Sequence, residues 1–475
     1  MMAIPRAGNS ATEALPAPTP LQSLAFGSFW LFNVAYYSRV FELAFSSLHI
    51  PLILGMVALL GSVVGGGILR TLRTTIGMCM LALTALYAAN VPFSSWRTGS
   101  LQVFTESWLK SGLAFLIAAS VVVTLRHCRW AMYSIATGTA LGAVLVSWKG
   151  TMVYGRLTMA WGTFGNSNEI AFSLLLGLPL LGLMFIDPHA GSFRKLLIGA
   201  AIIITLLVLV QTGSRGGLIG LAVVGFFAFR AVSLPGKIMM VLAVGVLIAV
   251  AGALLSGSLR DRYATIFSDD AATGDDLRSA EDARTLQLAT SSSQARRALF
   301  LRSLKVTMEH PLLGCGIGQF GAYTAGLDYA AGMRADWMGT HNTYTQVSSE
   351  AGIPALIVFL VLIVSCFRSL GACYRRAARI QTTRAGDIAN MAYALRTSLW
   401  AYAICAAFAH VAYDPTLPVM AGLTVGIVGI AQSELACAER EMAEKGAPSV
   451  AGTGARQAPL SAIGPAGRSR PATGV

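Results

Sequence analysis

Charged residues are scarce in this chain of 475 amino acids. They make up 12% of the sequence and hydrophobic residues make up 55%, whereas about 25% of the residues in a soluble globular protein are charged. This composition excludes an ordinary soluble protein and places the chain among integral membrane proteins. The formal net charge of +13 does not indicate binding to nucleic acid, because the basic residues lie in short loops between apolar runs.

Patterns that would indicate a cofactor or a covalent scaffold are also missing. The seven cysteines include no CxxC pair, and only Cys315 lies in a segment that we expect outside the cytoplasm, so neither a disulfide framework nor a structural zinc site is expected. No cluster of His, Cys, Asp and Glu has the spacing of a metal site, and no Walker A motif is present. We therefore expect the protein to need no metal ion and no cofactor. The first 20 residues lack the apolar core of a cleavable signal peptide, so none is expected.

Long apolar runs are what the sequence has in abundance. A membrane-spanning helix needs about 20 mostly apolar residues, and twelve segments approach this length. The first of them is weak, because Asn33, Arg39 and Glu42 interrupt or flank it. The expected fold is therefore an all-α integral membrane protein with about 12 transmembrane helices. The candidate spans are 22–38, 48–67, 74–93, 103–125, 130–148, 167–186, 196–212, 216–229, 238–256, 342–367, 391–412 and 416–434.

The orientation of these helices follows from the distribution of Lys and Arg, which is richer in cytoplasmic loops. Alternate loops carry the basic residues, for example Arg70 and Arg73, Arg126 and Arg129, and the run from Arg368 to Arg384. This pattern predicts that both termini are cytoplasmic. The resulting segments are a cytoplasmic N-terminal segment 1–21, transmembrane helices one to nine in 22–256, a long periplasmic loop 257–340, transmembrane helices ten to twelve in 341–434 and a disordered cytoplasmic tail 435–475.

The loop 257–340 is long for a compact membrane protein, and loops of this length are usually functional. Its first half is polar, and its second half, about 293–309, has the periodicity of an amphipathic helix. Arg297, Leu301, Leu304 and Met308 fall on one face of that helix. We expect the helix to lie in the membrane interface, although an ordinary surface helix has the same pattern.

Two motifs place arginines where they could meet an anion. Arg215 lies within Gly213-Ser214-Arg215-Gly216-Gly217, between two apolar runs, where glycines let the backbone turn sharply. An arginine there is costly unless it has a partner, and its fork of donors suits a phosphate group. It either binds a diphosphate or is a snorkelling arginine that anchors a turn. Arg296 and Arg297, on the amphipathic helix, either hold an anionic lipid head group or form a solvated face.

His341 precedes a long apolar run, within Thr340-His341-Asn342-Thr343-Tyr344. Histidine is the side chain whose ordinary pKa lies nearest neutral pH, so at the outer mouth of a span it can act as a general base. A capping or interface histidine is the alternative. His310 precedes Pro311 and is expected to end the amphipathic helix. The remaining histidines have the pattern of structural or loop residues: His49, His127, His189 and His410.

Taken in order, these motifs resemble the O-antigen ligase family, which is related to O-antigen polymerases and to bacterial protein O-oligosaccharyltransferases. The resemblance covers about 150–360, and a weaker similarity is found at Tyr413-Asp414-Pro415. Ser167 stands where the family often has Pro, and Phe300 where it often has Trp. The segments that carry the resemblance are Arg156-Leu157, Gly162–Asn168 with Ala171, Gly213–Gly217, Arg296–Phe300, His310–Gly314, Gly316–Phe320, and His341–Tyr344 with Glu350, Gly352 and Ile353.

Such ligases transfer O-antigen from undecaprenyl diphosphate to lipid A–core oligosaccharide in the periplasmic leaflet of the inner membrane. The resemblance implies that His341 accepts the proton of the acceptor hydroxyl, and that Arg215 and Arg297 hold the diphosphate, with inversion at the anomeric carbon. Arg297 is favoured over Arg296 because it lies on the apolar stripe. Substrate contacts are implied for a further set of motif residues: Arg296, Arg156, Asn168, Asn342 and Tyr344.

The implied partners are the undecaprenyl-diphosphate-linked donor, the lipid A–core acceptor and the lipid bilayer, with no nucleic acid. Three alternatives stay open from the sequence. A polymerase of the same superfamily would use a second lipid-linked glycan as acceptor, and a protein O-oligosaccharyltransferase would use a protein. A flippase or secondary transporter would be expected to carry ionisable residues near the middle of its spans, whereas the polar residues here gather at span ends.

Overall fold

Helices form nearly all of the chain in the computed structural model, which describes residues 19–40, 50–64, 67–153, 155–159, 164, 166–254, 280–335 and 337–446. The α-helices are α1 (Pro20–Ser38), α3 (Ile50–Val64), α4 (Gly67–Leu72), α5 (Thr75–Asn90), α6 (Arg97–Val103), α7 (Leu109–Val121), α8 (Leu125–Lys149), α9 (Ser167–Phe185), α10 (Ser192–Gln211), α11 (Arg215–Ala231), α12 (Leu234–Leu254), α14 (Ala280–Glu309), α15 (Phe320–Ala330), α16 (Thr343–Ala377), α17 (Thr383–Cys405) and α18 (Thr416–Gly446). A 3-10 turn η2 (Val91–Phe93), a π turn η3 (Phe104–Trp108) and an antiparallel hairpin of β1 (Thr151–Val153) and β2 (Arg156–Thr158) complete the described elements.

Membrane-spanning character is clear for six helices in the described part of the chain. They are long and apolar enough to cross a bilayer, and they are Thr75–Phe93, Leu125–Lys149, Ser167–Phe185, Ser192–Gln211, Thr343–Ala377 and Thr416–Arg440. The other predicted spans coincide with helices that are shorter or less apolar. For example, α7 has 13 residues and follows a π turn. The chain is thus an all-helical membrane protein, and the count of twelve spans stays a prediction.

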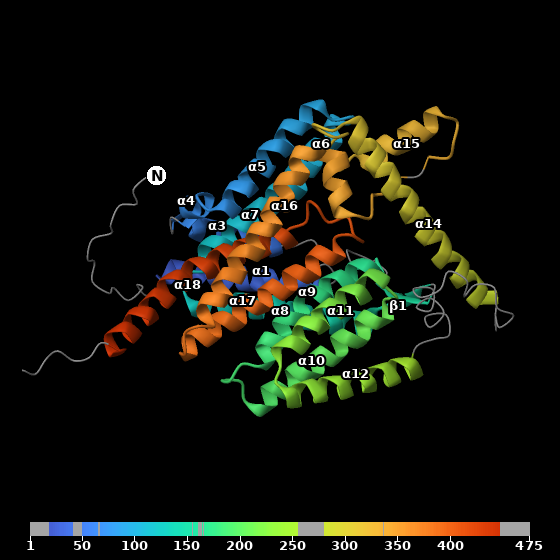
Figure 1. The fold of residues 1–475 in the computed structure, drawn as a ribbon. Coiled ribbons are helices and arrows are strands. Elements are labelled where there is room, and N and C mark those ends of the chain that lie inside the picture. Colours follow the sequence, from blue (N-terminus) through green and yellow to red (C-terminus); the bar gives the residue numbers. More distant parts are fainter. Residues whose placement is uncertain are drawn as a thin grey trace, which may run out of the picture.

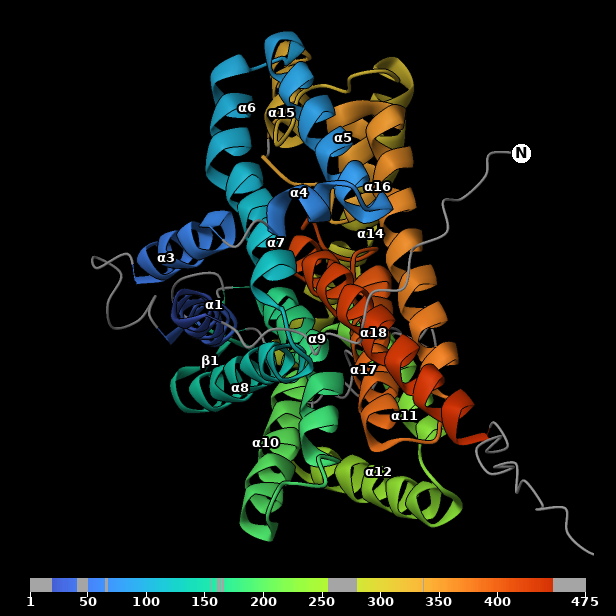
Figure 2. The same ribbon diagram turned by 90° about the vertical axis from the view of Figure 1, so that its left-hand side faces the viewer.

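The core lies where α7, α8, α16, α17 and α18 meet, as Figures 1 and 2 show. Its largest fully buried side chains include Phe115, Met132 and Phe359. Small residues let the helices approach closely, as is common in membrane bundles. A Cβ on Gly177 of α9 would come within 1.9 Å of Thr139 Oγ1 on α8. The ends of the bundle are distinct: α14 and β1 lie on the right in Figure 1, and the end of α18 lies on the left.

The loop predicted at 257–340 is largely helical where it is described. The amphipathic helix begins at Ala280, well before residue 293, and ends at Glu309, and α15 follows it. Leu301, Leu304 and Met308 are exposed by 55%, 40% and 74%, so the apolar stripe of α14 does not pack on the protein. That exposure suits the predicted interfacial position, which stays a prediction. Residues 257–279 lie outside the described residues.

The last helix, α18, continues to Gly446. It therefore extends into the segment 435–475 that the sequence analysis assigns to a disordered tail. The rest of that segment, 447–475, and most of the predicted N-terminal segment 1–21 lie outside the described residues.

A break in α16 organises the outer end of the bundle. Gly352 has φ 86°, a left-handed conformation that favours glycine, and Pro354 follows it. The interruption frees backbone carbonyls that would be costly to leave unpaired in a membrane. The segment 311–318 satisfies them, because the amides of Cys315 and Gly316 donate to the carbonyls of Ser349 and Glu350 at 2.8 and 3.0 Å. Glycine is required at this contact, since a Cβ on Gly352 would lie 2.2 Å from the Leu312 carbonyl oxygen.

Candidate active site

Arg215 is the first residue of α11 and follows a tight turn after α10. Gly213 has φ 59°, and the Ser214 hydroxyl caps the helix by accepting from the Gly217 amide at 3.2 Å. A Cβ on Gly216 would lie 2.9 Å from the Phe408 side chain. The glycines therefore do two things: one permits the turn, and the next brings α11 against the loop between α17 and α18.

Arg156 and Asn168 hold the turn before Arg215 in place through hydrogen bonds. Arg156, on β2, donates from Nε to the Thr212 carbonyl at 2.9 Å and from Nη2 to Asn168 Oδ1 at 2.9 Å. The sequence predicts that both residues contact substrate. The structure places them in bonds to each other and to the turn that carries Arg215, which makes them positioning residues in this conformation.

His341 lies just before α16 in a strained backbone conformation. Its φ is 51°, and a non-glycine residue held there costs free energy and often marks a functional site. Asn342 caps α16 by accepting from the amides of Tyr344 and Thr345 at 3.0 and 3.1 Å. The Tyr344 hydroxyl donates to the Ala403 carbonyl at 2.6 Å. Asn342 and Tyr344, both predicted to contact substrate, therefore orient the segment that holds His341.

His410 lies in the candidate site. The sequence had instead placed this residue among the structural or loop histidines. Its ring lies edge to face with that of His341, with centroids 4.9 Å apart. The contact follows from two bonds that join the motif to the loop 406–412. The Thr343 amide donates to the Ala406 carbonyl at 2.7 Å, and the Thr343 hydroxyl donates to the Ala409 carbonyl at 2.8 Å. The sequence signal was its place at the outer end of a predicted span, close to Tyr413-Asp414-Pro415.

Of the two adjacent arginines on α14, Arg296 faces the site. It is half-buried, and Arg297 is exposed. Burial and the neighbouring charge of Arg215 lower the pKa of Arg296, and the charge of Arg296 acts in turn on His341. The apolar stripe that favoured Arg297 in the sequence turns away from the protein. Arg215, Arg296, His341 and His410 therefore converge, and Arg297 lies outside the group.

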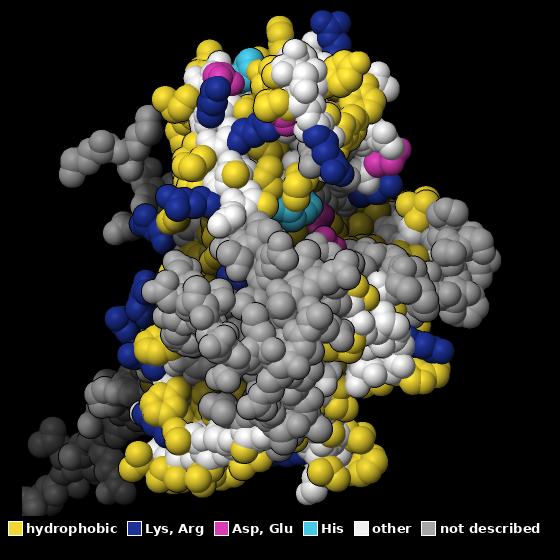
Figure 3. Space-filling view, turned by 90° about the vertical axis from the view of Figure 1, so that its right-hand side faces the viewer, with side chains coloured by type: hydrophobic (Ala, Val, Ile, Leu, Met, Phe, Trp, Pro, Cys, Tyr) yellow, Lys and Arg dark blue, Asp and Glu magenta, His cyan; other side chains and the backbone are white. Residues whose placement is uncertain are grey.

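The electrostatics of this group favour an anion. Burial, His410 and Arg296 together lower the pKa of His341 to about 4, and burial lowers the pKa of His410. The positive charges of Arg215 and Arg296 repel each other, and an anion bound between them would offset this repulsion. At neutral pH both imidazoles are unprotonated, so His341 can accept a proton. Figure 3 looks onto the side of the molecule from which α14 projects, where Lys, Arg and His side chains are visible.

Glu350, on α16, joins the elements around the site. The sequence motif includes this residue, but the motif alone did not indicate its role. Its carboxylate accepts from the Gly318 amide at 2.9 Å, the Phe320 amide at 3.4 Å and the Tyr413 hydroxyl at 2.6 Å. It thus joins α16, the segment before α15 and the loop before α18. Within the described residues, no three His, Cys, Asp or Glu side chains are grouped so that they could hold a metal ion.

Residues 200–360 match the family model described as O-antigen ligase. The match contains Arg215, Arg296, His341 and Glu350. Over these residues, about a third of the chain, the sequence is similar to the O-antigen ligase family. No curated protein matches the chain at significant similarity. This match confirms the family resemblance predicted from the sequence motifs, and it implies a glycosyltransferase activity of the ligase or polymerase type on lipid-linked glycans in a membrane.

Proposed function

We propose that this protein is an O-antigen ligase, which transfers a glycan from undecaprenyl diphosphate to lipid A–core oligosaccharide at the periplasmic face of the inner membrane. The observation that carries the proposal is the convergence of two arginines, Arg215 and Arg296, with the unprotonated imidazole of His341. A diphosphate leaving group needs cations that stabilise its developing charge, and an attacking hydroxyl needs a base.

The reaction is a single displacement. His341 accepts the proton of an acceptor hydroxyl as that oxygen forms a bond to the anomeric carbon of the donor. The bond between this carbon and the diphosphate oxygen breaks, and the diphosphate leaves as an anion held by Arg215 and Arg296. Attack opposite to the leaving group inverts the anomeric carbon. The two arginines supply the positive charge that a metal ion supplies in other transferases.

The low pKa of His341 is compatible with its role as a base. A base with a pKa of about 4 is weak, but that value belongs to the protein without substrate. Binding of the diphosphate places negative charge beside the imidazole and raises its pKa toward neutrality. The donor therefore prepares the base that will be used on the acceptor, while the free protein keeps His341 unprotonated.

One observation separates a transferase from a transporter. Arg215 and His341 lie at helix ends, at the start of α11 and before α16, and Arg296 lies on α14, which is not among the candidate membrane spans, whereas a transporter would carry such groups near the middle of a span. A polymerase or a protein O-oligosaccharyltransferase would use the same cations and base with another acceptor, so the acceptor must be identified by its product.

The test combines purified protein with undecaprenyl-diphosphate glycan and lipid A–core, with EDTA and without ATP. We expect a gel shift of lipid A–core, and a rate about 10²–10⁴ lower in His341→Ala. The matched control is His189→Ala, because His189 is exposed on the loop between α9 and α10. Lengthening of the lipid-linked glycan alone would identify a polymerase, and a requirement for added metal would contradict the arginine mechanism.

A further inference from the structure

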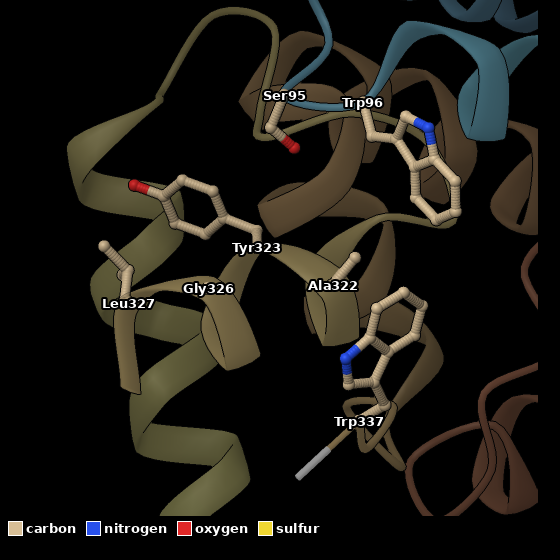
Figure 4. A pocket seen from close by; sticks show the side chains of 7 residues that line it. All are labelled: Ser95, Trp96, Ala322, Tyr323, Gly326, Leu327 and Trp337. Atoms are coloured by element: carbon tan, nitrogen blue, oxygen red, sulfur yellow. The ribbon is translucent and has the colours of Figure 1, made fainter. Parts of the chain in front are cut away.

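A second concave site includes Trp337, in the segment that leads to His341. It has a volume of about 580 Å³ and is lined by Ser95, Trp96, Ala322, Tyr323, Gly326, Leu327 and Trp337. Figure 4 shows the two indole rings along one side and Ser95 between Tyr323 and Trp96. The lining combines flat aromatic surfaces with a few polar groups, which is the composition of a small-molecule site.

The two tryptophans are unusual in being both exposed and paired. Trp96 is 48% exposed and Trp337 is 68% exposed, yet their rings lie edge to face with centroids 5.9 Å apart. They come from chain segments far apart in sequence. Aromatic faces carry partial negative charge and attract the positive edges of other groups. The C–H groups on the face of a sugar ring are such edges, and the hydroxyls around the ring can bond to the polar groups of the lining.

Hydrogen bonds fix two parts of the lining, Tyr323 with α15 and Ser95. The Tyr323 hydroxyl is 2.9 Å from His310 Nε2, and α15 is clamped to α14 by the Arg302–Asp328 pair, with contacts of 2.7 and 2.8 Å. On the other side, the Ser95 amide donates to the Cys315 carbonyl at 3.0 Å. A preformed surface loses little conformational entropy when it binds a ligand.

The position of Trp337 connects this pocket to the chemistry. Three residues lie between it and His341, and the four Cα-to-Cα steps that join the two residues span at most about 14 Å in an extended chain. A chain of sugars whose terminal unit lies at His341 can therefore reach the indole rings. From this geometry we propose that the pocket of Trp96, Tyr323 and Trp337 is a glycan-binding subsite that holds sugar units of a substrate remote from the reacting bond. This inference rests on the proposed function, because it takes His341 as the reaction centre.

The test is direct binding of lipid-free saccharides to the purified full-length protein, measured by saturation-transfer NMR titration. The probes are the core oligosaccharide released from host lipopolysaccharide, which represents the acceptor, and the released O-polysaccharide repeat, which represents the donor. We expect Trp337→Ala and Trp96→Ala to weaken binding of one probe about tenfold, in line with the loss of a buried aromatic anchor. The probe that responds identifies which substrate uses the subsite. Trp337→Phe, which keeps a ring, should recover part of the affinity.

Trp148→Ala is the matched control, because Trp148 is 74% exposed at the end of α8 and does not line the pocket. Equal saccharide binding in all variants, or an equal loss in Trp148→Ala, would overturn the inference and leave the tryptophans as interface anchors. Inorganic pyrophosphate separates this result from the proposed function. Its binding should be lost in Arg296→Ala and retained in the tryptophan variants, which also reports that they are folded. Saccharide binding without pyrophosphate binding would instead contradict the diphosphate site.

Discussion

At the scale of single residues, Arg296 and Arg297 have the same chemistry and adjacent positions but opposite environments. We expect Arg296→Ala to lower kcat by about 10²–10³, the loss typical of one donor that stabilises a leaving anion. Arg297→Ala should leave kcat close to that of the parent protein. Steady-state transfer assays with both variants decide the point. A larger loss in Arg297→Ala would mean that α14 rotates when substrate binds.

The pH dependence of transfer is a second consequence at this scale. Protonation of His341 removes the base, so the rate falls as the pH drops through its pKa. For kcat/KM, which reports the free protein, the fall should be centred near pH 4. For kcat, the bound diphosphate raises the pKa of His341, and the fall should occur at higher pH. A kcat/KM profile centred near the ordinary histidine value of about 6.5 would contradict this environment.

His410 gives an independent check of the same coupling. Repulsion from the protonated form of His410 contributes to the low pKa of His341, so His410→Gln should raise that pKa and move the acidic fall of kcat/KM to higher pH. His127→Gln is a useful comparison, because His127 stacks on Phe26 with ring centroids 4.1 Å apart and is not part of the site. A profile that does not move in His410→Gln would show that the two rings are not electrostatically coupled in solution.

At the scale of elements, the break in α16 determines whether the site assembles. Gly352→Ala would force a side chain into a left-handed conformation and into the Leu312 carbonyl. We expect it to lower the free energy of unfolding by about 2 kcal/mol or more, measured by denaturant titration in detergent. Gly429→Ala, in α18 with open space around it, should stabilise the protein slightly. Equal effects of the two variants would show that the break is not a constraint.

The sequence predicted these elements unevenly, for physical reasons. Apolar length predicted the helical membrane fold, and local chemistry singled out Arg215 and His341 as candidates, because a Gly-flanked arginine and a histidine at a span end are visible within a few residues. The choice of Arg296 depends on how α14 rotates against α16, and the role of His410 depends on a contact between chain segments far apart. The intramolecular bonds of Arg156 and Asn168 depend on a hairpin that the apolar pattern does not reveal.

At the scale of the whole molecule, α16 is a candidate membrane-spanning helix, so its two ends should lie on opposite sides of the membrane. Its part after the break at Gly352, residues 353–377, is about 37 Å of helix, which exceeds the hydrocarbon thickness of about 30 Å. We expect Ala331→Cys to react with an impermeant maleimide in intact spheroplasts and Gln381→Cys to react only after lysis. The native cysteines are buried except Cys437, which should be replaced by Ser in both variants. Reaction of both sites in intact cells would contradict the orientation.

The convergence of Arg215, Arg296, His341 and His410 also determines when, during synthesis of the chain, the site can assemble. Each residue comes from a different part of the chain, and His410 enters the site only after α17 has been made and inserted. A ribosome-bound chain that ends before α17 carries both arginines and His341, but not the loop that bonds to Thr343 and holds His341 in its strained conformation. The protein therefore becomes competent late in its own synthesis, when most of the bundle is already in the bilayer.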